Sequence, residues 1–134
     1  KLRINLSGNY TYQQALDVTN SDPASEEGRT YKHQIAYTPR VSGSGQVGIE
    51  TSWVNLSYSF LFSGKRYTQG ENITENRMES YSDHSISVGR ELTIRKINTS
   101  IHIEVLNIAN NNYEIIKNFP MPGRSVRATF SIKY

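Results

Sequence analysis

Hydrophobic and polar side chains alternate with period two along most of this chain. Successive side chains on a β-strand point to opposite faces of a sheet, so the alternation predicts strands with one apolar and one polar face. Six such strands are predicted, over residues 2–13, 34–50, 54–62, 86–92, 100–105 and 125–134. The sequence shows no amphipathic helix of three turns. The predicted fold class is therefore all-β.

The predicted connections alternate between long and short. Long polar segments cover residues 19–30, 68–81 and 108–122, whereas the turns at 51–53 and 93–96 are short. An antiparallel up-and-down meander places all of its long connections at one end of the sheet. The pattern predicts a single unit over residues 1–134, and short turns opposite long loops are typical of outer-membrane barrels.

The alternation fits two environments. In a soluble sandwich the apolar face is the core, whereas in a membrane barrel it faces lipid and the polar face lines a wet interior. The predicted strands 2–13 and 34–50 exceed the usual length of about 5 to 6 residues and suffice for the roughly 9 to 11 that cross a bilayer. Tyrosine is abundant, with 9 of 134 residues. Those on or near the apolar face, as in an interfacial aromatic girdle, are Tyr10, Tyr12, Tyr58, Tyr67 and Tyr134.

The last predicted strand alternates up to its final residue, an aromatic one. This ending resembles the C-terminal signal by which outer-membrane barrels are recognised for assembly, although Ala128 stands where glycine is frequent and tyrosine replaces the commoner phenylalanine. The residues predicted to face lipid and form this signal are Val126, Phe130, Ile132 and Tyr134. The chain also begins on Lys1 inside a predicted strand, and we expect it to be a piece of a longer protein.

The segment 104–125 reads EVLNIANNNYEIIKNFPMPGRS and resembles the C-terminal end of TonB-dependent outer-membrane receptors. The matching positions are Asn107, Asn110, Tyr113, Glu114, Pro120, Pro122, Gly123 and Arg124. The segments YTPR (37–40) and FLFSGKRYT (60–68) resemble two further strands of these receptors, although Val41 stands where histidine is frequent. We expect structural roles for the motif: Gly123 permits tight backbone geometry, the prolines stiffen the loop, and Arg124 pairs with Glu114.

The resemblance implies that this chain is the C-terminal part of a 22-stranded barrel, with the plug domain and earlier strands upstream. Such receptors take up a scarce, bulky nutrient of the siderophore-iron, haem or cobalamin class. The implied partners are TonB through the plug, outer-membrane lipid, the barrel assembly machinery and the small-molecule nutrient. The implied location is the outer membrane of a Gram-negative bacterium. The alternative that stays open is a soluble or surface β-sandwich that binds carbohydrate or protein.

Ligand contact is expected from polar and aromatic side chains at the tips of the long loops. These candidates are Arg29, Tyr31, Asn76, Arg77, Tyr81, Asn111 and Asn112.

Composition narrows the remaining functions. The net charge is +3, but the basic residues are scattered among 12 acids, which argues against nucleic acid as a partner. The chain has no cysteine, so disulfides and thiolate metal sites are excluded, and no apolar run approaches the roughly 18 to 20 residues of a membrane helix.

The three histidines, His33, His84 and His102, lack metal-ligand spacing. Asp83, His84 and Ser85 do not form a catalytic group, because neighbouring residues on one strand point to opposite faces. No enzyme activity, metal site or cofactor is expected.

Overall fold

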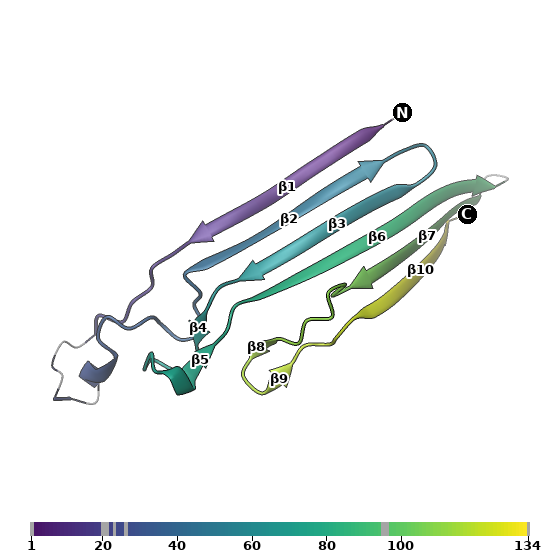
Figure 1. The fold of residues 1–134 in the computed structure, drawn as a ribbon. Helices are drawn as coiled ribbons and strands as arrows, with labels where there is room; N and C mark the ends of the chain where they lie inside the picture. Colours follow the sequence, from purple (N-terminus) through teal and green to yellow (C-terminus); the bar gives the residue numbers. More distant parts are fainter. Residues whose placement is uncertain (1, 20–21, 23, 26, 95–96, 134) are drawn as a thin grey trace.

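The computed structural model describes residues 2–19, 22, 24–25, 27–94 and 97–133, and its fold is all-β. One antiparallel sheet of six strands has the order β1-β2-β3-β6-β7-β10. Its strands are β1 (Arg3–Tyr12), β2 (Val41–Glu50), β3 (Asn55–Ser63), β6 (Tyr81–Ile94), β7 (Ile97–Leu106) and β10 (Ser125–Lys133). Neighbours in the sheet follow one another along the chain, apart from the two small hairpins described next (Figure 1). The sheet is open, because β1 and β10 are its outer strands.

Two small hairpins and two 3-10 turns lie at one end of the sheet. They are β4 (Arg66–Tyr67) with β5 (Arg77–Met78), β8 (Glu114–Ile116) with β9 (Phe119–Pro120), η1 (Glu27–Thr30) and η2 (Thr74–Asn76). Figure 1 shows these elements and the long connection from β1 to β2 at one end, which we call the loop end. The opposite end, where the β2–β3 connection lies and where β6 ends and β7 begins, is called the turn end. Within the described residues, no helix is long and apolar enough to cross a membrane.

The strand register aligns the apolar side chains of all six strands on one face. Phe60, for example, lies opposite Gly45 on β2 and His84 on β6. The apolar side chains of this face are Ile4, Leu6, Tyr10, Tyr12, Val41, Val47, Ile49, Leu56, Tyr58, Phe60, Phe62, Ile86, Val88, Leu92, Ile97, Ile101, Ile103, Val105, Val126, Ala128, Phe130 and Ile132. We call it the apolar face.

The apolar face is uncovered. Leu6 is 80% exposed, Phe130 61% and Phe60 41%, although each belongs to the most apolar surface of the chain. Among the described residues the only buried hydrophobic side chain is Met78, on the β5 strand at the loop end. A soluble domain buries such a face against a second layer, and no described segment of this chain provides that layer.

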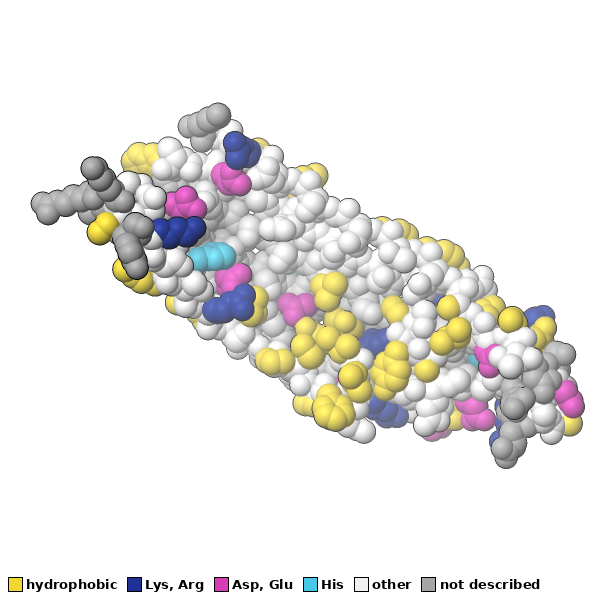
Figure 2. Space-filling model, turned by 180° about the vertical axis from the view of Figure 1, so that it is seen from behind, with side chains coloured by type: hydrophobic (Ala, Val, Ile, Leu, Met, Phe, Trp, Pro, Cys, Tyr) yellow, Lys and Arg dark blue, Asp and Glu magenta, His cyan; other side chains and the backbone are white. Residues whose placement is uncertain are grey.

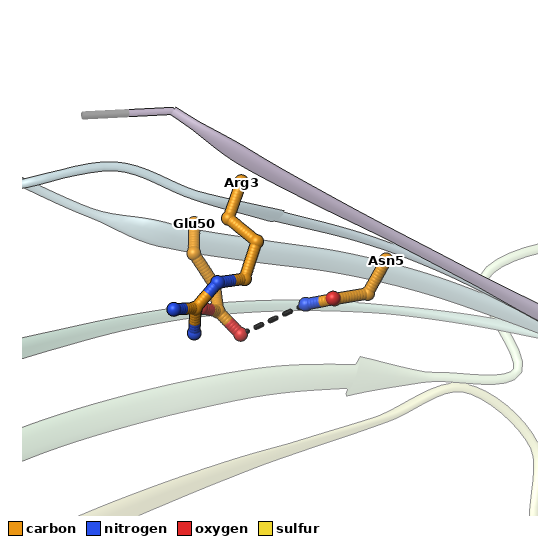
Figure 3. Close-up of polar contacts among 3 residues, drawn as sticks. All are labelled: Arg3, Asn5 and Glu50. Atoms are coloured by element: carbon orange, nitrogen blue, oxygen red, sulfur yellow. Dashed lines mark hydrogen bonds and ion pairs between the residues drawn. The ribbon is translucent and has the colours of Figure 1, made fainter.

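The opposite face is polar. The Ser57 and Ser87 hydroxyls of β3 and β6 lie 2.6 Å apart. Near the turn end, the Glu50 carboxylate accepts hydrogen bonds from Arg3 at 3.1 Å and Asn5 at 2.9 Å (Figure 3). Figure 2 shows this face, on which neutral polar side chains and backbone predominate over the strands. We call it the polar face.

The predicted meander is confirmed, but several boundaries are wrong. The second strand begins at Val41 and not at residue 34, because the backbone N–H groups of Ile35 and Tyr37 donate to Ala15 and Tyr67 and not to a sheet neighbour. The fourth strand begins at Tyr81 and not at residue 86, because residues 81–85 pair with β3. Polar side chains do not prevent this pairing, since the ladder bonds are made by the backbone.

Candidate functional site

Buried polar side chains mark the loop end. Those described as buried are Gln34, Ser63, Arg66, Asn76 and Asn107. All five lie in the loops and hairpins or at the strand end that joins them. Because a buried polar group must be hydrogen-bonded to be tolerated, such a cluster fixes the conformation of the loops around it.

Arg66 links three segments of the loop end. Its side chain is 3% exposed, and its guanidinium donates to the carbonyl oxygens of Glu79, Glu114 and Ile115. The same guanidinium lies over the Tyr81 ring, 5.1 Å from the ring centre. Arg66 therefore ties β4 to the start of β6 and to β8.

A pair of stacked tyrosines continues this contact. The Tyr81 and Tyr113 rings lie 4.4 Å apart at an interplanar angle of 6°. The Tyr113 hydroxyl donates to Asp83 at 2.5 Å, and burial together with this carboxylate raises the pKa of Tyr113 above its usual value. The other Asp83 carboxylate oxygen, Oδ1, is buried without a donor among the described residues.

The Asn107–Asn111 segment makes a tight turn after β7. Asn107 is 2% exposed and has a φ of 49°, in the left-handed region that asparagine tolerates better than most residues. Its amide donates to the carbonyl oxygens of Asn111 and Pro122, and its Oδ1 accepts from the Asn111 N–H. Asn110, with a φ of 55°, accepts from the Arg124 N–H at 2.8 Å. Asparagine side chains thus hold both ends of the last loop together.

The other motif residues complete this loop. Glu114 of β8 pairs with Pro120 of β9, and the Glu114 carboxylate accepts from the Asn118 N–H at 3.0 Å. The expected ion pair between Arg124 and Glu114 is not found among the described residues: the Glu114 carboxylate bonds the Asn118 N–H, and the backbone N–H of the exposed Arg124 donates to Asn110. A Cβ at Gly123 would lie 2.9 Å from the Asn110 Oδ1, so close packing and not an unusual φ requires glycine there.

The first loop has its own polar network. The Asp17 carboxylate accepts from the hydroxyls of Thr30 and Thr19, and these bonds, that of Thr30 above all, lower the pKa of Asp17 to about 2. Asn72 joins this loop to the β4–β5 region: its side chain bonds the backbone of Gln34 in both directions, and its N–H donates to His33 Nδ1 at 3.3 Å.

The structure brings four of the seven ligand-contact candidates together. A groove of about 660 Å³ at the loop end is lined by Arg77, Tyr81, Asn111 and Asn112, with Lys117 and Pro120 among its other walls. Tyr81 is the first residue of β6 and not a loop tip.

The remaining three candidates lie elsewhere. Asn76 is 9% exposed and donates to the Glu71 carbonyl oxygen, so it is held inside its loop. Arg29 and Tyr31 lie in and beside η1, in the first loop, and Tyr31 contacts the Lys32 ammonium, which is 5.2 Å from its ring centre. Neither lines the groove.

The predicted lipid-facing residues lie on the apolar face of β10. Val126 is 68% exposed, Phe130 61% and Ile132 56%. Tyr134 lies outside the described residues. Of the other tyrosines expected there, Tyr10, Tyr12 and Tyr58 share this face, whereas Tyr67 belongs to β4.

A second groove lies on the polar face towards the turn end. It measures about 490 Å³ and is lined by side chains that include Asn5, Glu50, Ser57, Ser87 and His102. Small serine and glycine side chains of β2, β3 and β6 leave this space. In the described part of the chain, no three His, Asp or Glu side chains are grouped to hold a metal ion.

The sequence did not single out Arg66 or Asp83 as functional residues. Arg66 stands within the FLFSGKRYT segment that carries part of the family resemblance, which is the signal that could have identified it. Asp83 had no comparable signal, because its burial depends on Tyr113, 30 residues further along the chain.

Comparison with models of known protein families finds no match, and comparison with curated proteins finds no matching relative.

Proposed function

We propose that this chain forms part of the wall of an outer-membrane β-barrel of the TonB-dependent receptor class. The observation that supports this most strongly is the uncovered apolar face, which extends over all six strands opposite a hydrogen-bonded polar face. A barrel wall in a bilayer has the same two-sided character, because its outer side chains meet lipid and its inner side chains meet water. A sandwich would instead bury this face against a second sheet.

Aromatic side chains at both ends of the sheet support the same placement. Tyr10 and Tyr12 are 72% and 65% exposed at the loop end of β1. Trp53, 74% exposed, lies in the β2–β3 turn at the other end. Amphipathic aromatic rings favour the two interfaces of a membrane, so the strands between them would cross the hydrocarbon.

In this proposal the loop end lies at the extracellular surface of the membrane, and the polar face lines the interior of the barrel. The chain would be the C-terminal part of a 22-stranded barrel whose plug, upstream, contacts TonB. The barrel assembly machinery would insert it into the outer membrane of a Gram-negative bacterium. Its nutrient would belong to the siderophore-iron, haem or cobalamin class, and the groove at Arg77, Tyr81, Asn111 and Asn112 would contact it.

Cysteine scanning tests the membrane placement directly, because the chain contains no cysteine. Spin labels would be attached to Ser59→Cys, Phe60→Cys, Thr129→Cys and Phe130→Cys in the protein reconstituted into lipid vesicles. We expect labels at positions 60 and 130 to collide with oxygen, which dissolves in lipid, and labels at 59 and 129 to collide with a water-soluble nickel chelate. If labels at 60 and 130 are shielded from both reagents, the apolar face is a protein core and the sandwich alternative is correct.

Uptake assays test the receptor class. A strain that lacks the protein should accumulate less of one labelled nutrient from a panel of ferric siderophores, haem and cobalamin. The loss should be absent in a strain that also lacks TonB, because uptake there is already abolished. If loss of the protein leaves uptake of the whole panel unchanged in the strain that contains TonB, the transport function is contradicted, whereas the membrane placement is not affected.

A further inference from the structure

A smaller pocket, which shares Tyr81 with the groove at the loop end, lies between the first loop, β4 and β8. It has a volume of about 390 Å³, and its walls are formed mainly by Tyr37, Pro39, Tyr81, Ile115 and Ile116. Arg66 and Ser63 supply its polar groups. Figure 2 shows hydrophobic side chains gathered near these hairpins, in contrast to the polar surface over the strands. An apolar pocket with a few convergent polar groups is the usual form of a small-molecule site.

Arg66 gives this pocket a buried positive charge without a neutralising acid. Its hydrogen bonds all go to backbone carbonyl oxygens, and no described carboxylate lies within ion-pair distance of it. The nearby Glu79 carboxylate is 60% exposed and pairs with Lys65 and Arg77. A buried charge normally has a partner, and the attraction of a buried charge for an anion is less screened than in bulk water.

Tyr37 is held at the pocket wall in an unfavourable backbone conformation. Its φ is 57°, in the left-handed region that bulky side chains rarely adopt. The Tyr37 N–H donates to the Tyr67 carbonyl oxygen at 2.7 Å, which fixes the first loop against β4, next to Arg66. Residues held in such conformations are concentrated at ligand sites.

We propose that this pocket binds a small organic carboxylate with an apolar ring. The carboxylate would face Arg66, and the ring would pack between Tyr37 and the side chains of Ile115 and Ile116. Arginine is well suited to this contact, because its planar guanidinium matches a carboxylate. Binding does not depend on the proposed membrane location, but a role as a recognition subsite for the transported nutrient rests on the proposed function.

Fluorine NMR with 4-fluorobenzoate tests the site on the detergent-solubilised protein. We expect saturable broadening of the probe signal. The neutral isostere 4-fluorobenzamide has the same ring without the charge, so we expect it to bind at least about ten-fold more weakly. Equal binding of the two probes, or no saturable benzoate binding, would overturn the proposal.

Two variants locate the binding. Ile116→Trp should fill the pocket and abolish benzoate binding while leaving the Arg66 hydrogen bonds in place. Ile132→Trp is its control, because Ile132 is 56% exposed on β10 and Ile116 is 55% exposed on β8. Arg66→Gln should also abolish binding, and Arg3→Gln, at an exposed arginine of β1 far from the pocket, should retain it.

The variants and the cysteine scan together separate failure of the pocket proposal from failure of the membrane proposal. Arg66→Gln removes buried hydrogen bonds, so if it fails to fold, the Ile116→Trp and Ile132→Trp pair still decides the location. Benzoate binding retained in Ile116→Trp would place the probe elsewhere and overturn the proposal. If the spin labels at positions 60 and 130 do not report lipid while benzoate binds, only the proposed membrane function is wrong. If the labels report lipid but benzoate does not bind, only the proposed ligand pocket is wrong.

Discussion

The six-stranded sheet and the loop end are stabilised in different ways. The sheet is held by continuous backbone ladders over six strands, while its apolar side chains remain uncovered. The loop end contains the one buried hydrophobic residue described, Met78, and the buried polar side chains such as Arg66 and Asn107. There, side chains bond to the backbone of distant segments.

This difference shows which part of the chain specifies its own structure. Most buried polar side chains of the loop end are hydrogen-bonded within the chain, so its conformation is determined mainly by contacts among the loops and hairpins. The sheet leaves a hydrophobic surface whose stabilisation depends on what covers it, which in our proposal is lipid. Changes at the loop end should therefore alter the stability of the protein strongly, and changes on the sheet only weakly.

The largest expected effect comes from Asn107→Ala. The change removes three hydrogen bonds and places alanine at a φ of 49°, so we expect a loss of about 2 to 3 kcal/mol in the free energy of unfolding. Denaturant unfolding of the detergent-solubilised protein measures it. Asn112→Ala, at an exposed neighbour for which the structure shows no side-chain hydrogen bond, should cost less than about 0.5 kcal/mol. Equal effects of the two variants would contradict the distinct role of the loop end.

On the sheet, Gly45→Ala should have a smaller effect. The Phe60 ring lies over Gly45, and an added Cβ would come within 2.5 Å of its Cε1 atom. The exposed ring can move, so we expect a cost of about 1 kcal/mol in the same unfolding measurement. Gly48→Ala meets only ordinary contacts, the nearest at 3.7 Å, and should instead stabilise the strand by roughly 0.5 kcal/mol. A shared sign for the two variants would refute the packing explanation.

The smallest expected effect is the acid response of the first loop. The pKa of Asp17 is about 2 in the folded protein, below the unfolded value near 3.9. The stability that Asp17 contributes is therefore fully present above about pH 4 and is lost as the pH falls towards about 2. Hydrogen exchange of the Thr19 amide, which donates to Asp17, should accelerate over this window relative to the intrinsic rate. Asp17→Asn should abolish the pH dependence, and its persistence in that variant would exclude Asp17 as the cause.

Alternation in the sequence was sufficient to predict the sheet but not its ends. The third strand, predicted over 54–62, corresponds to β3 at Asn55–Ser63, because its side chains alternate at every position except Leu61. The prediction failed at Ile35 and Tyr37, where apolar residues also alternate but the backbone turns away to bond with other loops. It missed the short hairpins β4–β5 and β8–β9, whose two or three residues give no periodic signal.

The candidate site was predictable only in part. Asparagine, proline and glycine in the segment 107–124 indicated a tightly constructed loop, and the structure shows such a loop around Asn107 and Asn110. The contacts of Arg66 with β8 and of Asp83 with Tyr113 join residues 30 to 49 positions apart. Sequence spacing contains no information on such pairs, because they depend on how the loops pack together.

The even number of strands has a consequence for how such a sheet can vary. β1 begins and β10 ends at the turn end (Figure 1), so each pair of antiparallel strands returns the backbone to the end of the sheet at which it began. Duplicating or deleting one pair would change the width of the sheet while leaving every loop at its original end. Hairpins are thus units that evolution can add or remove without inverting the molecule.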